Sequence, residues 1–170
     1  MSEQKKKPKI EDIISEYHDE DTKKNALDFV AFLRENKLSP TRMHSDVHWV
    51  VKHKGKSVCH LNIDKNNEWM IRHCQFTREK WFVNYEQHIT DENLKAYILD
   101  NIRDPANVCI GGGCKGKQNK TILGKKFAAV CNCWPLLIKN PKGDILENEK
   151  KLITVIKTVI ADFTTANKAQ

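Results

Sequence analysis

The chain has 170 residues, the size of one domain, of which 39% are hydrophobic and 30% are charged. No apolar run approaches the roughly 18 residues of a membrane-spanning helix, and the first residues are charged, unlike a signal peptide. These features argue against a membrane or secreted protein and predict a cytoplasmic one. The six cysteines are therefore expected to be free thiols or metal ligands and not disulfides.

The net charge of +7 is confined to the C-terminal third of the sequence. From residue 109 onward there are eleven lysines, no arginine and four acidic residues, whereas the preceding part is balanced. A basic block of this kind attracts nucleic acid and other anions. A solvated lysine-rich face is the alternative, and the absence of arginine favours it, because arginine is the usual reader of bases and phosphates.

The first 21 residues are predicted to be a flexible lead that contains one short helix. Residues 1–9 are polar and predicted to be disordered. The apolar residues that follow have the spacing of one helix face: Ile10, Ile13, Ile14 and Tyr17. Residues 22–170 are predicted to form a single domain. Its first helix is predicted to run from a cap at Thr22 to about Asn36, and residues 37–43 to form a loop.

Alternation of period two then predicts an antiparallel hairpin around Gly55. A two-residue turn leaves both faces of this hairpin mixed in polarity. A three-residue loop with a left-handed Gly55 places Trp49 and Cys59 on one apolar face, so we prefer that register. It predicts that His48 and His60 lie opposite each other on the polar face.

A third strand over residues 69–76 is predicted to complete a three-stranded meander, with Trp69 and Ile71 on the core face. Cys74 lies in this strand and is predicted, like Cys59, to be a small buried hydrophobic residue. Two helical segments follow in the prediction. They are a turn that begins at Thr77 and a helix over 91–103 that is capped by Thr90 and ended by Pro105.

Residues 106–143 are predicted to be irregular apart from a strand over 126–130, and a helix from Asp144 or Asn140 to about Thr165 ends the chain. The broad apolar stripe of this helix is typical of core packing, with a homodimer seam as the alternative. The elements together predict an α+β fold. It consists of an antiparallel meander packed with helices, a cysteine-rich irregular segment and a long C-terminal helix.

Four cysteines have the spacing C-x4-C-x16-C-x-C: Cys109, Cys114, Cys131 and Cys133. Two close pairs separated by a loop are typical of a tetrahedral zinc site, and the glycines at 111–113 allow the first pair to curl around a metal ion. Nearby lysines offset the negative charge of a zinc tetrathiolate. The sequence therefore predicts a structural zinc ion whose binding stabilises this segment.

Three alternatives to zinc remain open for these cysteines. Four thiolates also hold iron–sulfur clusters. Cys131 and Cys133 are alternatively a redox pair or a site for a thiophilic effector such as a soft metal ion. Finally, all four cysteines are consistent with unligated, partly packed thiols.

Other motifs carry less weight. Residues 111–118 resemble a phosphate-binding G-x4-G-K-[ST] loop, but Gln118 replaces the hydroxyl that binds magnesium. His48 and His60 are candidates for a metal site or a pocket, with solvated surface histidines as the default. Glu79 is a candidate for a pocket edge together with two neighbouring aromatic residues, for which core packing is the default. No catalytic residue is assigned.

Two segments carry a resemblance to known proteins. Residues 75–82 (QFTREKWF) and 121–134 (TILGKKFAAVCNCW) resemble an uncharacterised family of small clostridial-type, Firmicutes proteins. The similarity runs from about Asn25 to Asp162, and some relatives keep a Cys-Gly-Gly turn similar to the one between Cys109 and Cys114. This family implies no activity, because none is established for it.

The sequence as a whole predicts a cytoplasmic, zinc-stabilised binding or regulatory module of unknown ligand. A thiol-based redox or effector-binding protein that uses Cys131 and Cys133 is the first alternative. A nucleic-acid-binding accessory protein that uses the lysine-rich C-terminal third is the second.

Overall fold

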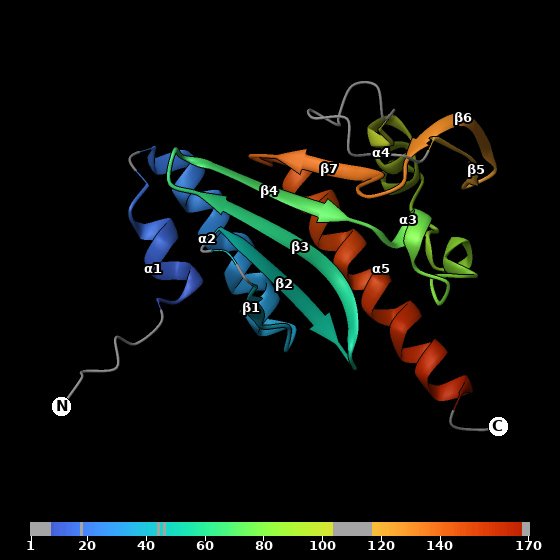
Figure 1. The fold of residues 1–170 in the computed structure, drawn as a ribbon, viewed down its shortest axis with the longest axis horizontal. Coiled ribbons are helices and arrows are strands. Elements are labelled where there is room, and N and C mark those ends of the chain that lie inside the picture. Colours follow the sequence, from blue (N-terminus) through green and yellow to red (C-terminus); the bar gives the residue numbers. More distant parts are fainter. Residues whose placement is uncertain (1–7, 18, 44, 46, 104–116, 168–170) are drawn as a thin grey trace.

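The computed structural model describes residues 8–17, 19–43, 45, 47–103 and 117–167 (Figure 1). In these residues a five-stranded antiparallel sheet with the order β1-β2-β3-β4-β7 lies beside a two-stranded hairpin, β5-β6. The strands are β1 (Pro40–Arg42), β2 (His48–His53), β3 (Lys56–Asp64), β4 (Glu68–His73), β5 (Lys117–Ile122), β6 (Lys125–Cys131) and β7 (Leu136–Lys139). The helices are α1 (Ile10–Ser15), α2 (Glu20–Glu35), α3 (Gln75–Arg78), the 3-10 helix η1 (Tyr85–His88), α4 (Glu92–Asn101) and α5 (Asp144–Ala166). This arrangement confirms the predicted α+β class.

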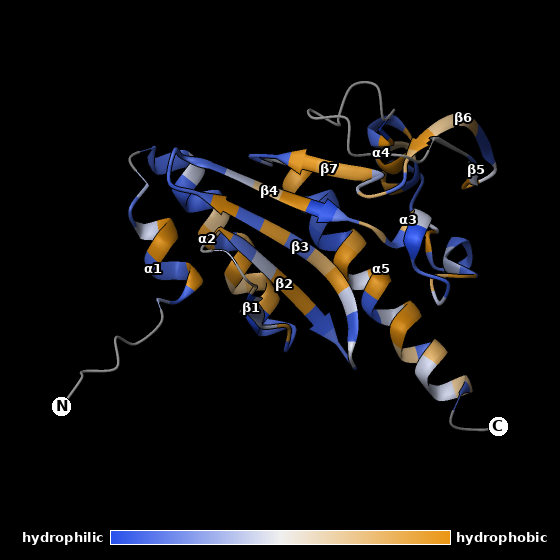
Figure 2. Ribbon diagram, viewed as in Figure 1, coloured by the Kyte–Doolittle hydropathy of each residue, from blue (hydrophilic) through white to orange (hydrophobic). Residues whose placement is uncertain are grey.

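The core lies between the sheet and the helices behind it. Figure 1 shows α2 and α5 passing behind the strands, and α5 packs against β3, α2 and α4. Figure 2 shows hydrophobic residues recurring along α5. These residues are buried inside the chain: Leu146, Leu152, Ile153, Ile156, Val159 and Ile160. The homodimer proposed through this helix stays a prediction. None of the helices in the described ranges combines the length and apolarity of a membrane span.

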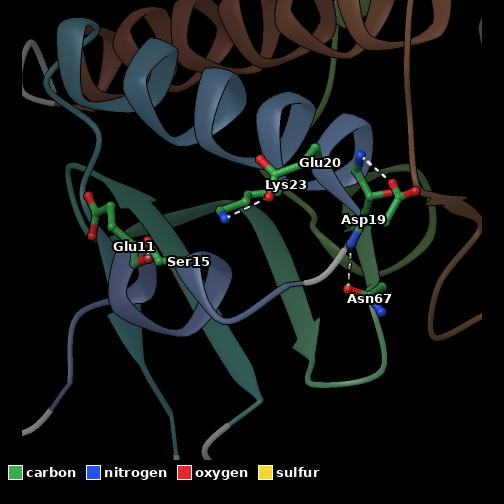
Figure 3. Close-up of polar contacts among 7 residues, drawn as sticks. Glu11, Ser15, Asp19, Glu20, Lys23 and Asn67 are labelled. Carbon is green, nitrogen blue, oxygen red and sulfur yellow. Dashed lines mark hydrogen bonds and ion pairs between the residues drawn. The ribbon is translucent and has the colours of Figure 1, made fainter.

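The helix caps differ from two of the predictions. The side chain of Asp19 caps α2 by accepting a hydrogen bond from the backbone N–H of Thr22 at 2.6 Å, so Thr22 is the donor and not the cap. The backbone N–H of Asp19 in turn donates to Asn67 in the β3–β4 turn at 3.2 Å (Figure 3). Asp91 likewise caps α4 in place of Thr90. In both places a carboxylate at the cap position accepts the free amides of the first turn.

The hairpin between β2 and β3 also differs from the predicted one. Lys54 and Gly55 form a two-residue turn with positive φ angles of 46° and 77°, the geometry that suits the twist of paired strands. The preferred three-residue loop is therefore wrong. A register shift between Val51 and Lys52 nevertheless restores the predicted faces, because one extra residue of β3 sits at that point.

The shifted register decides where the two histidines lie. Trp49 and Cys59 are on the core face, as predicted, and both are buried. His48 lies opposite Asn62 and not opposite His60, so the predicted direct pair is wrong. The two histidines still share the polar face, because they are separated by an even number of register steps.

The side chain of Gln75 binds the backbone of β3 at the register shift. Its side-chain amide donates to the carbonyl oxygens of Ser57 at 2.9 Å and Val58 at 2.8 Å, and the residue is buried. Gln75 is also the first residue of α3, which therefore begins two positions before the predicted start at Thr77. The strand predicted over 69–76 accordingly ends earlier, at His73.

Two predicted irregular segments contain strands. The predicted loop at 37–43 holds β1, a short edge strand whose first residue is Pro40, a position where the missing N–H is tolerated. The described part of 106–143 contains β5 and β7 in addition to the predicted β6. The turn between β5 and β6 again has two residues with positive φ, Leu123 and Gly124. The predictions for residues 1–7 and Pro105 lie outside the described residues.

A polar network joins three elements within the core. Glu149 of α5 is fully buried and accepts a hydrogen bond from the hydroxyl of Tyr97 in α4 at 2.6 Å. Its other oxygen lies 2.8 Å from Nε2 of His73 in β4, which is also fully buried. Burial raises the pKa of Tyr97, and the neighbouring Glu149 raises it further, so the phenol stays protonated. The network therefore joins α4 and α5 to strand β4 of the sheet.

Candidate functional site

A cavity of about 510 Å³ opens on the face of the sheet that α2 and α5 leave uncovered. Strands β2, β3 and β4, the segment after β4 and the segment after β6 all contribute to its wall. The lining residues are Met43, His48, His60, Arg72, Cys74, Arg78, Glu79 and Trp134. We call this cavity the Arg72 pocket.

Strand alternation places Arg72 in the pocket. Its neighbours Ile71 and His73 point into the core and are fully buried, so Arg72 points to the opposite face of β4. Across the sheet Arg72 lies opposite His60 of β3, and Cys74, two residues further along and just after the end of β4, also lines the pocket. One strand end therefore supplies a cation and a thiol to the same cavity.

A hydrogen bond between distant segments closes the other side of the pocket. The hydroxyl of Thr77 in α3 donates to the carbonyl oxygen of Asn132 at 2.9 Å. The backbone N–H of Trp134 contacts the sulfur of Cys131 at 3.4 Å, which tightens the turn that follows β6. These contacts hold the Trp134 ring above the sheet and next to α3.

Trp134 orients two of the pocket's polar side chains. The guanidinium of Arg72 lies over the Trp134 ring, 5.4 Å from its centre. The ring of His60 meets the same indole edge to face, with centroids 4.9 Å apart and planes at 69°. Such cation–π and edge contacts restrict side-chain rotation, so the pocket is organised before any ligand arrives.

Two arginines supply positive charge to the pocket, and Glu79 supplies one negative charge. Arg72 and Arg78 line it, and neither forms an ion pair within 4.0 Å in that part of the chain. Arg72 is half-buried, which lowers its pKa, and its Nε is buried without a hydrogen-bond partner. Its Nη2 makes a weak contact with the sulfur of Met70 at 3.4 Å.

The two histidines are neutral at physiological pH. Burial, followed by the charge of Arg72, lowers the pKa of His60 to about 4. The same two causes lower the pKa of His48. Nε2 of His60 lies 3.1 Å from the hydroxyl of Ser57, and Nδ1 of His48 lies 3.0 Å from the hydroxyl of Ser45. Neutral imidazoles offer one donor and one acceptor each.

Glu79 and Cys74 form the remaining polar wall. Glu79 accepts a short hydrogen bond from the indole N–H of Trp81, and its other oxygen lies 4.0 Å from the sulfur of Cys74. Burial, followed by Glu79, raises the pKa of Cys74 to about 11, so this thiol is not an activated nucleophile. Glu79 thus lies at a pocket edge, while Trp81 and Phe82 pack in the core.

The predicted zinc ligands are only partly described. Cys131 is buried at the end of β6 and Cys133 is partly exposed, whereas Cys109 and Cys114 lie outside the described residues. Within the described ranges there is no group of three or more His, Cys, Asp or Glu residues that could hold a metal ion. The four-cysteine site stays a prediction.

The phosphate-loop resemblance gains nothing from the structure. Its residues 111–116 lie outside the described part. Lys117 and Gln118 begin strand β5 and not the helix that follows a phosphate-binding loop.

Sequence reasoning missed the residues that define the Arg72 pocket. It named His48, His60 and Glu79 as pocket candidates but gave no role to Arg72 and Arg78, and it treated Cys74 as core. The alternation around Ile71 could have placed Arg72 on the same face as His60. Nothing in the sequence places Trp134 above that face.

Comparison with protein-family models, with curated proteins and with solved structures finds no match. The resemblance of residues 75–82 and 121–134 to the small clostridial-type family therefore stays a prediction.

Proposed function

We propose that this chain is a cytoplasmic binding module for a small organic anion. The observation that carries the proposal is the half-buried guanidinium of Arg72, which forms no ion pair with the described residues, in a cavity of about 510 Å³. Burying a charge without a partner is unfavourable, and a bound carboxylate or phosphate removes this cost by charge-assisted hydrogen bonds. Arg78 lines the same cavity and adds a second positive charge.

The neighbouring groups favour binding over catalysis. The Cys74 thiol is protonated and His60 is already engaged by Ser57 and Trp134. Neither group has the raised nucleophilicity that covalent catalysis requires. The sheet and the indole of Trp134 instead hold the guanidinium of Arg72 in a fixed position. Fixed donors are what selective binding of an anion needs.

Isothermal titration calorimetry of the full chain with phenyl phosphate and with benzoate tests the proposal. We expect saturable binding of at least one anion, weakened about tenfold or more by Arg72→Gln, since a hydrogen bond to a charged group contributes about 1.5–3 kcal/mol. Lys139→Gln is the matched control, because it removes one positive charge from an exposed residue outside the pocket. No binding of either anion by the native chain, or equal loss in both variants, would refute the proposal.

The structural zinc ion belongs to the same proposal. Strand pairing supports it, because Lys117, three residues after Cys114, lies opposite Cys131. Elemental analysis of the purified chain, with thiol counts before and after denaturation, is expected to give one zinc ion and four protected thiols besides the buried Cys59 and Cys74. Chelation is then expected to lower the melting temperature.

Other outcomes of these measurements favour the alternatives. Iron in place of zinc indicates a cluster, and fast alkylation of the native thiols indicates a redox or effector-binding protein. Binding of nucleic acid with steep salt dependence indicates the accessory role of the lysine-rich third.

A further inference from the structure

We infer that the ligand of the Arg72 pocket carries a nitrogen hydrogen-bond donor in addition to its anionic group, and that Glu79 accepts this donor. The inference rests on the proposed anion binding and goes further, because it specifies an amphoteric class of ligand. Amino-substituted phosphates and carboxylates belong to this class, whereas simple anions do not.

The carboxylate of Glu79 provides the acceptor. One of its oxygens is occupied by the indole N–H of Trp81, which fixes the side chain. The other oxygen lies 4.0 Å from the thiol of Cys74, which is a weak donor. Among the described residues Glu79 forms no ion pair within 4.0 Å. An ionised carboxylate accepts several hydrogen bonds, so this oxygen has free capacity toward the pocket.

The same cavity therefore contains both hydrogen-bond donors and a hydrogen-bond acceptor. Arg72 and Arg78 offer N–H groups and positive charge, and Glu79 offers negative charge. A simple anion satisfies the two arginines but places its own charge in the same cavity as Glu79, which weakens binding. An anionic ligand that also has an N–H or ammonium group pairs with the arginines and with Glu79, and so avoids leaving a polar group unpaired.

Apolar and aromatic side chains also line the cavity. Trp134 is partly exposed, and Met43 is 42% exposed and lines the same cavity. Methionine and tryptophan contact flat or aliphatic ligand parts without requiring hydrogen bonds. A ligand that fits these groups has an anionic group, a compact apolar part and a nitrogen donor.

A matched pair of probes tests the inference: 4-aminophenyl phosphate and phenyl phosphate, which differ by one amino group. Both are titrated calorimetrically into the native chain and into the Glu79→Gln variant. The glutamine keeps an oxygen for Trp81 but offers an amide in place of the second acceptor oxygen. We expect the native chain to bind the amino probe about tenfold more tightly, and the variant to lose this preference while still binding phenyl phosphate.

The outcomes separate the inference from the proposal beneath it. Equal affinity of the native chain for the two probes overturns the inference and leaves anion binding intact. An amino-group preference that persists in Glu79→Gln also overturns it, because another acceptor is then responsible. Failure of both probes to bind the native chain refutes anion binding itself. If the variant does not fold, judged by circular dichroism, the comparison of the two probes on the native chain still tests the nitrogen donor, because equal affinities overturn the inference without the variant.

Discussion

The guanidinium of Arg72 lies over the indole ring of Trp134, 5.4 Å from its centre. This contact joins the open face of β4 to the segment after β6, two parts of the chain that are held together near α3 by the hydrogen bond from Thr77 to Asn132. The sheet thus supplies the cation of the pocket, and the segment after β6 supplies the surface that orients it.

Replacement of Trp134 by leucine is expected to weaken anion binding about three- to tenfold, because a cation–π contact contributes about 0.5–2 kcal/mol. Trp134→Phe keeps an aromatic face and is expected to retain most of the affinity. Calorimetric titration of both variants with phenyl phosphate checks this. Equal affinities for the leucine and phenylalanine variants would show that the aromatic face has no part in orienting Arg72.

The buried network around Glu149 is expected to be a major source of stability. Glu149→Ala leaves the Tyr97 hydroxyl and His73 without their shared partner, so we expect a loss of about 3–5 kcal/mol in the free energy of unfolding. Tyr97→Phe removes one hydrogen bond and is expected to cost about 1–2 kcal/mol. Urea unfolding followed by circular dichroism measures both. A loss below about 1 kcal/mol for Glu149→Ala would contradict this role.

His60 is expected to make the fold less stable in acid. Its pKa is about 4 in the folded chain, below the ordinary histidine value, so the unfolded chain binds more protons between about pH 6.5 and 4. Stability therefore falls as the pH falls through this window, by on the order of 1–2 kcal/mol for a half-buried group.

Urea unfolding of the native chain and of His60→Asn at pH 7, 5.5 and 4 isolates this effect. The variant is expected to lose less stability on acidification than the native chain. Parallel pH profiles for the two proteins would mean that His60 does not titrate as the structure implies.

The β2–β3 turn offers a stabilising substitution. Lys54 has a φ of 46°, which asparagine adopts more readily than lysine, and Asn-Gly is the preferred sequence for this turn. Lys54→Asn is expected to raise the free energy of unfolding by about 0.5–1 kcal/mol. Gly55→Ala is the opposing control, since its φ of 77° strains any side chain although the space around it is open. A destabilised Lys54→Asn would argue against the two-residue turn.

Local patterns predicted those parts of the fold that depend on one face of one element. The spacing in α1, the apolar stripe of α5 and the core positions of Trp69 and Ile71 were correct, because burial enforces periodicity directly. The β2–β3 loop was wrong because pattern alone does not reveal a register shift. The cap of α2 was placed three residues too late and that of α4 one residue too early, because serine, threonine and aspartate are all good caps.

The candidate site was less predictable because it depends on contacts between distant segments. His60 and Arg72 become neighbours only through the β3–β4 register, and Trp134 reaches them only because β7 pairs with β4. The unpaired state of Arg72 is a property of the folded chain and has no local sequence signature. The cysteine spacing is a stronger sequence pattern than the residues of the Arg72 pocket, but half of the four cysteines lie outside the described part of the chain.

Nuclear magnetic resonance of the arginine side chains tests the central claim most directly. The Nε–H signal of Arg72, assigned by its loss in Arg72→Gln, is expected to shift in a saturable way as phenyl phosphate is added, because the guanidinium gains an anionic partner in the pocket. The signal of Arg34, which is paired with Glu11 outside the pocket, is expected to stay in place. An Arg72 signal that does not move, or that moves in step with Arg34, would contradict an anion site at this pocket.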